Sequence, residues 1–268
     1  MQPSPSPETL RAAPAWQIIE RSSYRFARAG RLDGPPVVLV HGLFGALSNW
    51  DASLRALADT YALYVPLLPI YEKSPVEPTL AGLTQYLVEF YQQERLAPAV
   101  WMGNSLGGHL ALLVARTAPQ AVKGLVLTGS SGLFEEGMGS TFPRRSSYEY
   151  VAERVRYTFY DPRHATPALI EEVFALVNDN YKALRILKIA REAQRDFVGP
   201  WLPQISAPTC LIWGLNDTIT PVRVAYAFYH LLPKAELHFI DHCGHAPMME
   251  QPERFYELLA PFLQRVWV

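Results

Sequence analysis

The chain has 268 residues, with 24 basic and 25 acidic side chains, and 49% of its residues are apolar. This is ordinary globular composition, which excludes wholesale disorder, and the length suits one large α/β domain or two small ones. A formal charge of −1 gives no electrostatic footprint for nucleic acid or an anionic membrane.

The ends and the cysteines indicate the compartment. No run of about 18 apolar residues is present, so we expect no membrane span. Residues 1–15 are rich in proline and serine and lack the apolar block of a secretion signal, so they are predicted to be a flexible N-terminal arm. Cys210 and Cys243 are too few for a disulfide framework and leave at most one bridge. We expect a cytoplasmic protein with reduced thiols.

Short apolar runs alternate with amphipathic stretches along most of the chain. After one or two antiparallel edge strands within 16–29, the apolar runs predict strands at 37–40, 61–68, 99–102, 124–128, 210–213 and 236–240. Pro66 should end the second of these runs early. The amphipathic stretches predict helices at 49–59, 79–95, 106–118, 221–232 and 252–266. This alternation predicts an α/β fold, with a mostly parallel sheet and helices on both faces.

One region breaks the alternation. Residues 133–203 contain no convincing strand, but helical stretches at 148–159, 167–178 and 181–197. Because this region lies between two predicted sheet strands, we interpret it as an inserted helical cap subdomain. The insertion should sit above the carboxyl ends of the strands, where open α/β sheets bind ligands. The core would then comprise residues 16–132 and 204–268.

The most informative stretch is Gly103-Asn104-Ser105-Leu106-Gly107, which matches G-x-S-x-G. An apolar strand precedes it and a helical segment follows, which is the setting of a nucleophile elbow. Glycine at 103 and 107 allows the strand and helix backbones to approach closely, and the helix start directs N–H groups at developing negative charge. We therefore predict that Ser105 is a nucleophile. A glycine-rich loop with a capping serine is the alternative.

A serine hydroxyl needs a base, and the base needs an acid that orients it. With this elbow the expected chain order is serine, acid, histidine. Among seven histidines, His245 follows the last predicted strand beside Gly244 and is the predicted base. His242, closer to the strand, is its rival.

Asp217 is the predicted acid. It lies in a turn directly after the strand at 210–213, where its carboxylate can fix the tautomer of the imidazole. An Asx turn or a cap before Pro221 is the alternative role. Asp241 is a second candidate, but it lies only four residues from His245 on the same loop, which makes the ring orientation awkward.

Acyl transfer also needs two N–H donors aimed at the developing oxyanion. Leu106, next to the nucleophile, is expected to supply one. The second should come from the sequence HGLFG after the strand at 37–40, with Leu43 favoured and Phe44 as the alternative. We expect His41 to bond the backbone of this loop.

No cofactor and no metal are expected. The glycine clusters match neither the P-loop nor the dinucleotide pattern. A zinc site is suggested by the grouping of His238, Asp241, His242, Cys243 and His245, but the sequence has no second cluster of ligands to support it.

Four segments together resemble the α/β-hydrolase superfamily: HGLFG (41–45), GNSLGG (103–108), LIWGLND (211–217) and CGHAP…QPERF (243–255). The likeness covers nearly the whole chain from about Trp16. It implies an eight-stranded, mostly parallel sheet, a triad of Ser105, Asp217 and His245, and a cap at the position of the helical insertion.

The resemblance extends to particular branches. The chain is similar to haloalkane dehalogenases and epoxide hydrolases, but these use Asp where it has Ser105. GNSLGG, and Asn104 in particular, resembles the meta-cleavage carbon–carbon bond hydrolases. The chain departs from these at Leu43 and Phe44, where they carry a glycine-rich stretch, and at Ala246, where they often have tryptophan. Residues 68–74 (LPIYEKS) lack the glycines of the usual D-x-x-G-x-G-x-S segment.

We therefore expect a serine hydrolase that cleaves small or medium carboxylic esters through an acyl-enzyme on Ser105. A carbon–carbon bond hydrolase of vinylogous diketones is the second hypothesis. A slow-turnover ligand receptor on a hydrolase scaffold is the alternative of another class. The expected partner is a small-molecule substrate with an apolar acyl or aryl group, and the protein should be a monomer or homodimer.

The expected substrate-binding residues are Phe44, Asn104, Phe134 and Met138. Most aromatic residues of the insertion should pack its own core, with some lining a pocket above Ser105. Basic residues also recur at three- and four-residue steps, at Lys182, Arg185, Lys188, Arg191 and Arg195. This pattern favours a solvated helix face over a cationic pocket for an acidic substrate.

Overall fold

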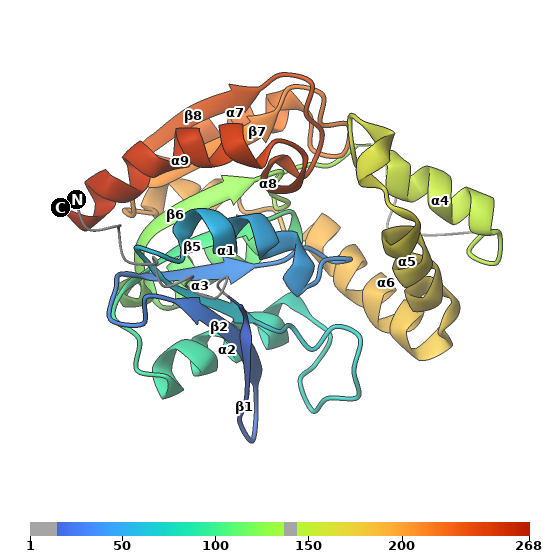
Figure 1. The fold of residues 1–268 in the computed structure, drawn as a ribbon, viewed down its shortest axis with the longest axis horizontal. Helices are drawn as coiled ribbons and strands as arrows, with labels where there is room; N and C mark the ends of the chain where they lie inside the picture. Colours follow the sequence, from blue (N-terminus) through green and yellow to red (C-terminus); the bar gives the residue numbers. More distant parts are fainter. Residues whose placement is uncertain (1–14, 137–143) are drawn as a thin grey trace, which may run out of the picture.

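The computed structural model describes residues 15–136 and 144–268, so the predicted pocket residue Met138 lies outside the described residues. Within these ranges eight strands form one sheet in the order β1-β2-β4-β3-β5-β6-β7-β8 (Figure 1). The strands are β1 (Gln17–Glu20), β2 (Arg25–Gly30), β3 (Pro36–Val40), β4 (Ala62–Pro66), β5 (Ala99–Asn104), β6 (Val122–Thr128), β7 (Thr209–Gly214) and β8 (Ala235–Ile240). Strand β2 is antiparallel to β1 and β4, and the remaining pairs are parallel, which confirms the predicted sheet.

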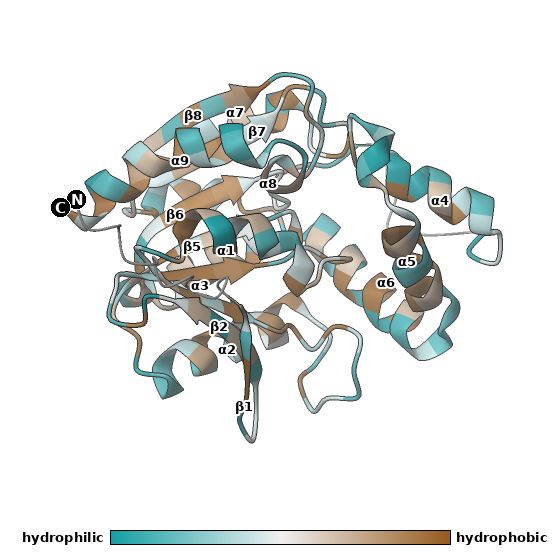
Figure 2. Cartoon of the chain, in the orientation of Figure 1, coloured by the Kyte–Doolittle hydropathy of each residue, from teal (hydrophilic) through white to brown (hydrophobic). Residues whose placement is uncertain are grey.

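Helices cover both faces of the sheet because its central strands are buried on both sides. Helices α2 (Leu80–Gln93), α3 (Leu106–Thr117) and α7 (Val222–Leu231) pack on one face, and α1 (Asp51–Leu57) and α9 (Pro252–Trp267) pack on the other. Strand β5 illustrates this, since Trp101 joins the first core and Val100 and Met102 join the second. Figure 2 shows the resulting apolar strands between helices with polar outer faces.

Three helices interrupt the alternation between β6 and β7, as the sequence predicted: α4 (Tyr148–Arg156), α5 (Pro167–Asn178) and α6 (Asn180–Arg195). Each begins at a side-chain cap, because Ser147, Thr166 and Asp179 accept hydrogen bonds from the first turn. The three helices stand together beyond the carboxyl ends of the central strands (Figure 1). The exact limits of a cap subdomain at 133–203 stay a prediction.

The segment after β8 contains a short helix that was not predicted. Helix α8 (Pro247–Glu250) precedes α9, where the sequence predicted only the helix from Pro252 onward. Pro252 begins α9 because it has no N–H to continue the turn before it, and Gln251 between the two helices has non-helical angles. After this break α9 packs on the same face of the sheet as α1.

The structure also bears on the cysteines and on the expected lack of a membrane span. Cys210 and Cys243 are both buried free thiols, with no bridge between them. In the part of the chain that the structure describes, no helix combines the length and apolar character needed to cross a membrane.

Candidate active site

Ser105 occupies a tight turn between β5 and α3. Its backbone angles are φ 57° and ψ −123°, in a region that side chains rarely adopt. The Ser105 amide donates to the carbonyl of Thr128 at 3.1 Å, and its own carbonyl accepts from Gly108 at 3.0 Å. These bonds fix the serine on both sides of the turn.

The two glycines of the motif allow the turn to form. A Cβ on Gly107 would lie 1.9 Å from the carbonyl oxygen of Val40, and one on Gly103 would lie 2.3 Å from that of Gly107. Each obstacle is backbone, which cannot move aside as a flexible side chain could. Crowding between strand and helix, inferred from G-x-S-x-G, is thus present at both positions.

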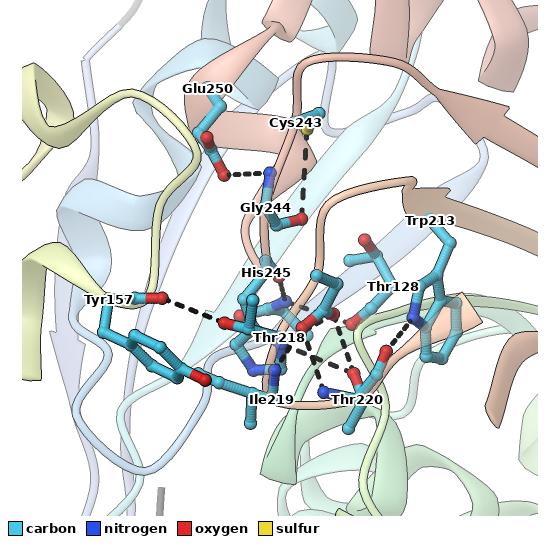
Figure 3. A network of polar contacts seen from close by, with 12 residues as sticks. Thr128, Tyr157, Trp213, Thr218, Ile219, Thr220, Cys243, Gly244, His245 and Glu250 are labelled. Atoms are coloured by element: carbon cyan, nitrogen blue, oxygen red, sulfur yellow. Dashed lines mark hydrogen bonds and ion pairs between the residues drawn. The ribbon is translucent and has the colours of Figure 1, made fainter. Parts of the chain in front are cut away.

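His245 and Asp217 form a buried pair beside this turn. Their side chains are 7% and 0% exposed, and Nδ1 of His245 donates to Oδ2 of Asp217 at 2.9 Å. The same carboxylate also accepts from the amides of Ile219 and Thr220, both at 2.9 Å, and from the Thr220 hydroxyl at 2.8 Å (Figure 3). Asp217 therefore makes the Asx turn and contacts the imidazole at once.

The main chain of His245 is held on both sides. Its amide donates to the carbonyl of Thr158, which follows α4, at 2.9 Å. Its carbonyl accepts from Nδ2 of Asn104 at 2.9 Å, and that amide also donates to Thr128 at 3.0 Å. Asn104, predicted to bind substrate, lines the cavity described below, and its amide nitrogen contacts the loop that carries His245.

Glu250 joins the His245 loop to the helical insertion. Its Oε1 accepts from the Gly244 amide at 2.9 Å (Figure 3). Its Oε2 accepts from the Tyr160 amide at 2.8 Å. Burial raises the pKa of Glu250, although the backbone N–H donors partly offset this effect. Sequence reasoning missed this residue, because nothing local distinguishes it from a surface glutamate.

Carboxylates dominate the electrostatics around the imidazole. Burial alone would lower the pKa of His245, but the charge and hydrogen bond of Asp217 outweigh it, and the net shift is upward from 6.5. The charges of Glu135 and Glu250 add to this effect. Glu135 also lines the cavity described below.

The two residues predicted to bind the oxyanion line the same cavity. Leu43 and Leu106 both line it, and Leu106 is the first residue of α3. Among the described residues, neither main-chain amide donates a hydrogen bond. A Cβ on Gly42 would lie 3.2 Å from Cβ of Ser105, so this loop lies against the serine.

A cavity of about 160 Å³ connects these groups. It is lined by Ser105, His245 and Phe44, by Asn104, and by apolar residues of the insertion such as Val155, Phe159, Leu169, Val173 and Ile189. In the described residues no hydrogen bond joins the Ser105 hydroxyl to His245. Phe134, predicted to bind substrate, is instead an exposed ring beneath the guanidinium of Arg223, 5.4 Å from the ring centroid.

The rival candidates lie elsewhere. His242 and Asp241 are both exposed, and the ring of His242 packs on Tyr160. His238 lies on β8 beside Glu236, which also pairs with Arg265. Among the described residues, Cys210, Glu236 and His238 form the one group of potential metal ligands whose ligand atoms lie within 4.8 Å of one another. It is separate from the cavity.

We predict that Gly107→Ala lowers the free energy of unfolding by about 3 kcal/mol or more, because its Cβ would collide with backbone. Gly124→Ala is the matched control, since a Cβ there meets its nearest atom, in the Val266 side chain, at 3.3 Å. It should cost no more than about 1 kcal/mol. Urea unfolding of both variants measures this, and equal losses would contradict the crowding argument.

We predict that Glu250→Gln lowers the pKa of His245, because a negative charge near the imidazolium is removed. In the wild type the imidazole should titrate above 6.5. NMR titration of the His245 ring measures both values. The control is Glu253→Gln, an exposed change on α9, which should leave the pKa of His245 unaltered. An unshifted pKa of His245 in Glu250→Gln would show that the charge of Glu250 does not act on the imidazole.

Known proteins that are similar to this chain identify its family. Residues 37–258 match the model of the alpha/beta hydrolase family. A 2-hydroxy-6-oxo-6-(2'-aminophenyl)hexa-2,4-dienoic acid hydrolase of Metapseudomonas resinovorans is 30% identical over 90% of this chain and 87% of that protein. A pimeloyl-[acyl-carrier protein] methyl ester esterase of Nitrosomonas europaea is 28% identical over 83% of this chain and 93% of its own length.

The solved structure of MGS-MChE2, an alpha/beta hydrolase enzyme from the metagenome of lagoon sediments of Mar Chica, Morocco, has a TM-score of 0.76 at 34% identity. That match covers 93% of this chain and 98% of MGS-MChE2. The chain belongs to the alpha/beta hydrolase family.

Proposed function

We propose that this hydrolase cleaves small or medium carboxylic esters through an acyl-enzyme on Ser105. The observation that carries the proposal is the meeting of Ser105, the His245–Asp217 pair and two unused amides at one largely apolar cavity. These are the parts that acyl transfer needs: a nucleophile, an oriented base and oxyanion donors. Helices α4, α5 and α6 would form the cap, since their residues line the cavity.

The proposed reaction uses each of these groups in turn. As substrate binds, the Ser105 hydroxyl donates to Nε2 of His245 and attacks the ester carbonyl. Asp217 holds the imidazole through Nδ1 and stabilises its cation. The amides of Leu43 and Leu106 bind the tetrahedral oxyanion. His245 then protonates the leaving alcohol, and water activated by the same imidazole releases the carboxylic acid.

Roles at the site can be separated by two matched pairs of variants. His245→Ala and Asp217→Asn should each lower kcat/KM for a p-nitrophenyl ester by about 10⁴-fold, because the base is lost or its tautomer is wrong. His242→Ala and Asp241→Asn should stay within about threefold of wild type, because both side chains are exposed and separate from the cavity. Comparable losses in the two pairs would reject the assignment.

The size and polarity of the cavity support a small acyl or aryl group. Its volume of about 160 Å³ is close to that of the engineered apolar cavity that binds benzene. The relative from Nitrosomonas europaea is a methyl ester esterase, which agrees with ester cleavage. A long acyl chain would have to extend beyond this volume, which favours short acyl groups.

A carbon–carbon bond hydrolase is the second candidate, favoured by the 30% identity to the dienoic acid hydrolase. Steady-state kinetics with p-nitrophenyl acetate, butyrate and palmitate, beside a vinylogous diketone, distinguishes the two. We expect kcat/KM to be highest for acetate or butyrate, lower for palmitate and lowest for the diketone. Faster turnover of the diketone than of every ester would favour carbon–carbon cleavage instead.

A further inference from the structure

The backbone carbonyls of Gly42 and Leu43, on either side of the Leu43 amide, both accept hydrogen bonds. The Gly42 carbonyl accepts from Nδ1 of His41 at 2.8 Å and from the Gly45 amide at 3.0 Å. The Leu43 carbonyl accepts from the hydroxyl of Tyr71, which also lies 3.5 Å from the carbonyl oxygen of Gly45. The tyrosine thus reaches across to the loop that lies against Ser105.

These contacts decide where the amides of the loop point. Peptide groups are planar and trans, so a C=O and the N–H of the next residue point in opposite directions. Fixing the Gly42 carbonyl orients the Leu43 amide, and fixing the Leu43 carbonyl orients that of Phe44. The Tyr71 hydroxyl therefore orients the peptide between Leu43 and Phe44 directly. It acts on the Leu43 amide only through the Leu43 residue, which this peptide shares with the one before it.

Tyr71 belongs to the segment between β4 and α2 that lacks the glycines of related hydrolases. A buried arginine of the insertion fastens this segment at both ends. Arg185, on α6, donates to the carbonyls of Pro69 at 2.7 Å and Ile70 at 3.0 Å, and to that of Val76 at 3.3 Å. Its guanidinium also lies 5.7 Å from the ring centroid of Tyr181.

The surroundings of Arg185 are unusual for a buried cation. The residue is 8% exposed, and within the described residues no carboxylate lies at ion-pair distance from it. Burying a charge against neutral carbonyls is a poor source of stability. Its consequence is geometric, because one planar fork fixes three carbonyls around the loop of Tyr71.

We propose that Tyr71 is a positioning residue for the oxyanion-binding loop, and that Arg185 holds the segment that carries it. This inference rests on the proposed function, because it takes an amide at Leu43 or Phe44 as an oxyanion donor. Tyr71 does not touch the reacting atoms and acts through the Leu43 carbonyl. The helical insertion thereby contributes to stabilisation of the transition state as well as to the cavity wall.

The chemistry of the hydroxyl suits this role. Burial, with a smaller effect from the charge of Glu172, raises the pKa of Tyr71. The hydroxyl therefore stays protonated and remains a donor at every pH at which a serine hydrolase works.

Tyr71→Phe removes the hydroxyl and keeps the ring. With p-nitrophenyl butyrate we expect kcat/KM to fall about ten- to a hundredfold with KM changed less than about twofold. Affinity for phenylboronic acid, which forms a tetrahedral adduct with an active serine, should fall by a similar factor. In the pH profile of kcat/KM, the midpoint of the acid limb should not move, because the substitution changes no charge.

Tyr256→Phe is the matched control. It removes another buried hydroxyl, bonded to Ser53 on α1, away from the segment of Tyr71. It should keep kcat/KM and boronate affinity within about twofold of wild type. Wild-type values of both quantities in Tyr71→Phe would overturn the proposal.

Arg185→Lys tests the second half of the proposal, because it keeps the charge and loses the planar fork. We expect a loss of kcat/KM in the same direction, and a double variant with Tyr71→Phe that loses less than the product of the single effects. Effects that multiply fully would show that Arg185 does not act through Tyr71. If the wild type fails to hydrolyse the ester, or if Ser105→Ala hydrolyses it equally well, the proposed function itself fails.

Discussion

The tight turn at Ser105 is the constraint on which the site depends. A positive φ at a non-glycine residue is unfavourable, and it persists here because strand and helix backbones meet at Gly103 and Gly107. The same turn also positions His245. Asn104, one residue before the serine, donates to the main chain of His245, so Ser105 and the imidazole share one support.

The helical insertion is part of this support and not only a cover. Thr158 accepts a hydrogen bond from the His245 amide, and Glu250 links Gly244 to Tyr160. A substitution that shifts the insertion should therefore alter the orientation of the imidazole as well as the shape of the cavity. If the proposed function holds, such a substitution should change substrate selectivity and rate together.

Much of the fold follows from the sequence because its signals are local. Continuous β-branched runs predict strands buried on both faces, and proline ends β4 where expected. The turn after β7 illustrates a limit of such reasoning. An Asx turn and a partner for histidine were alternatives for Asp217, yet its two oxygens allow both, and the local pattern could not reveal this.

What could not be predicted depends on contacts between distant segments. Asn104 and His245 are 141 residues apart, and the sequence carries no signal that the side chain of Asn104 contacts the main chain of His245. Arg185 belongs to a basic stripe predicted to face solvent, but it is buried. Helical periodicity could not identify it, because it faces a segment more than a hundred residues earlier in the chain.

The central claim is that Ser105 is a nucleophile activated by the imidazole of His245. Labelling with a fluorophosphonate, followed by mass-spectrometric mapping of the modified peptide, tests it most directly. We predict a single adduct on Ser105 in the wild type and none in His245→Ala. An adduct on another residue, or undiminished labelling of Ser105 without the imidazole, would contradict the account.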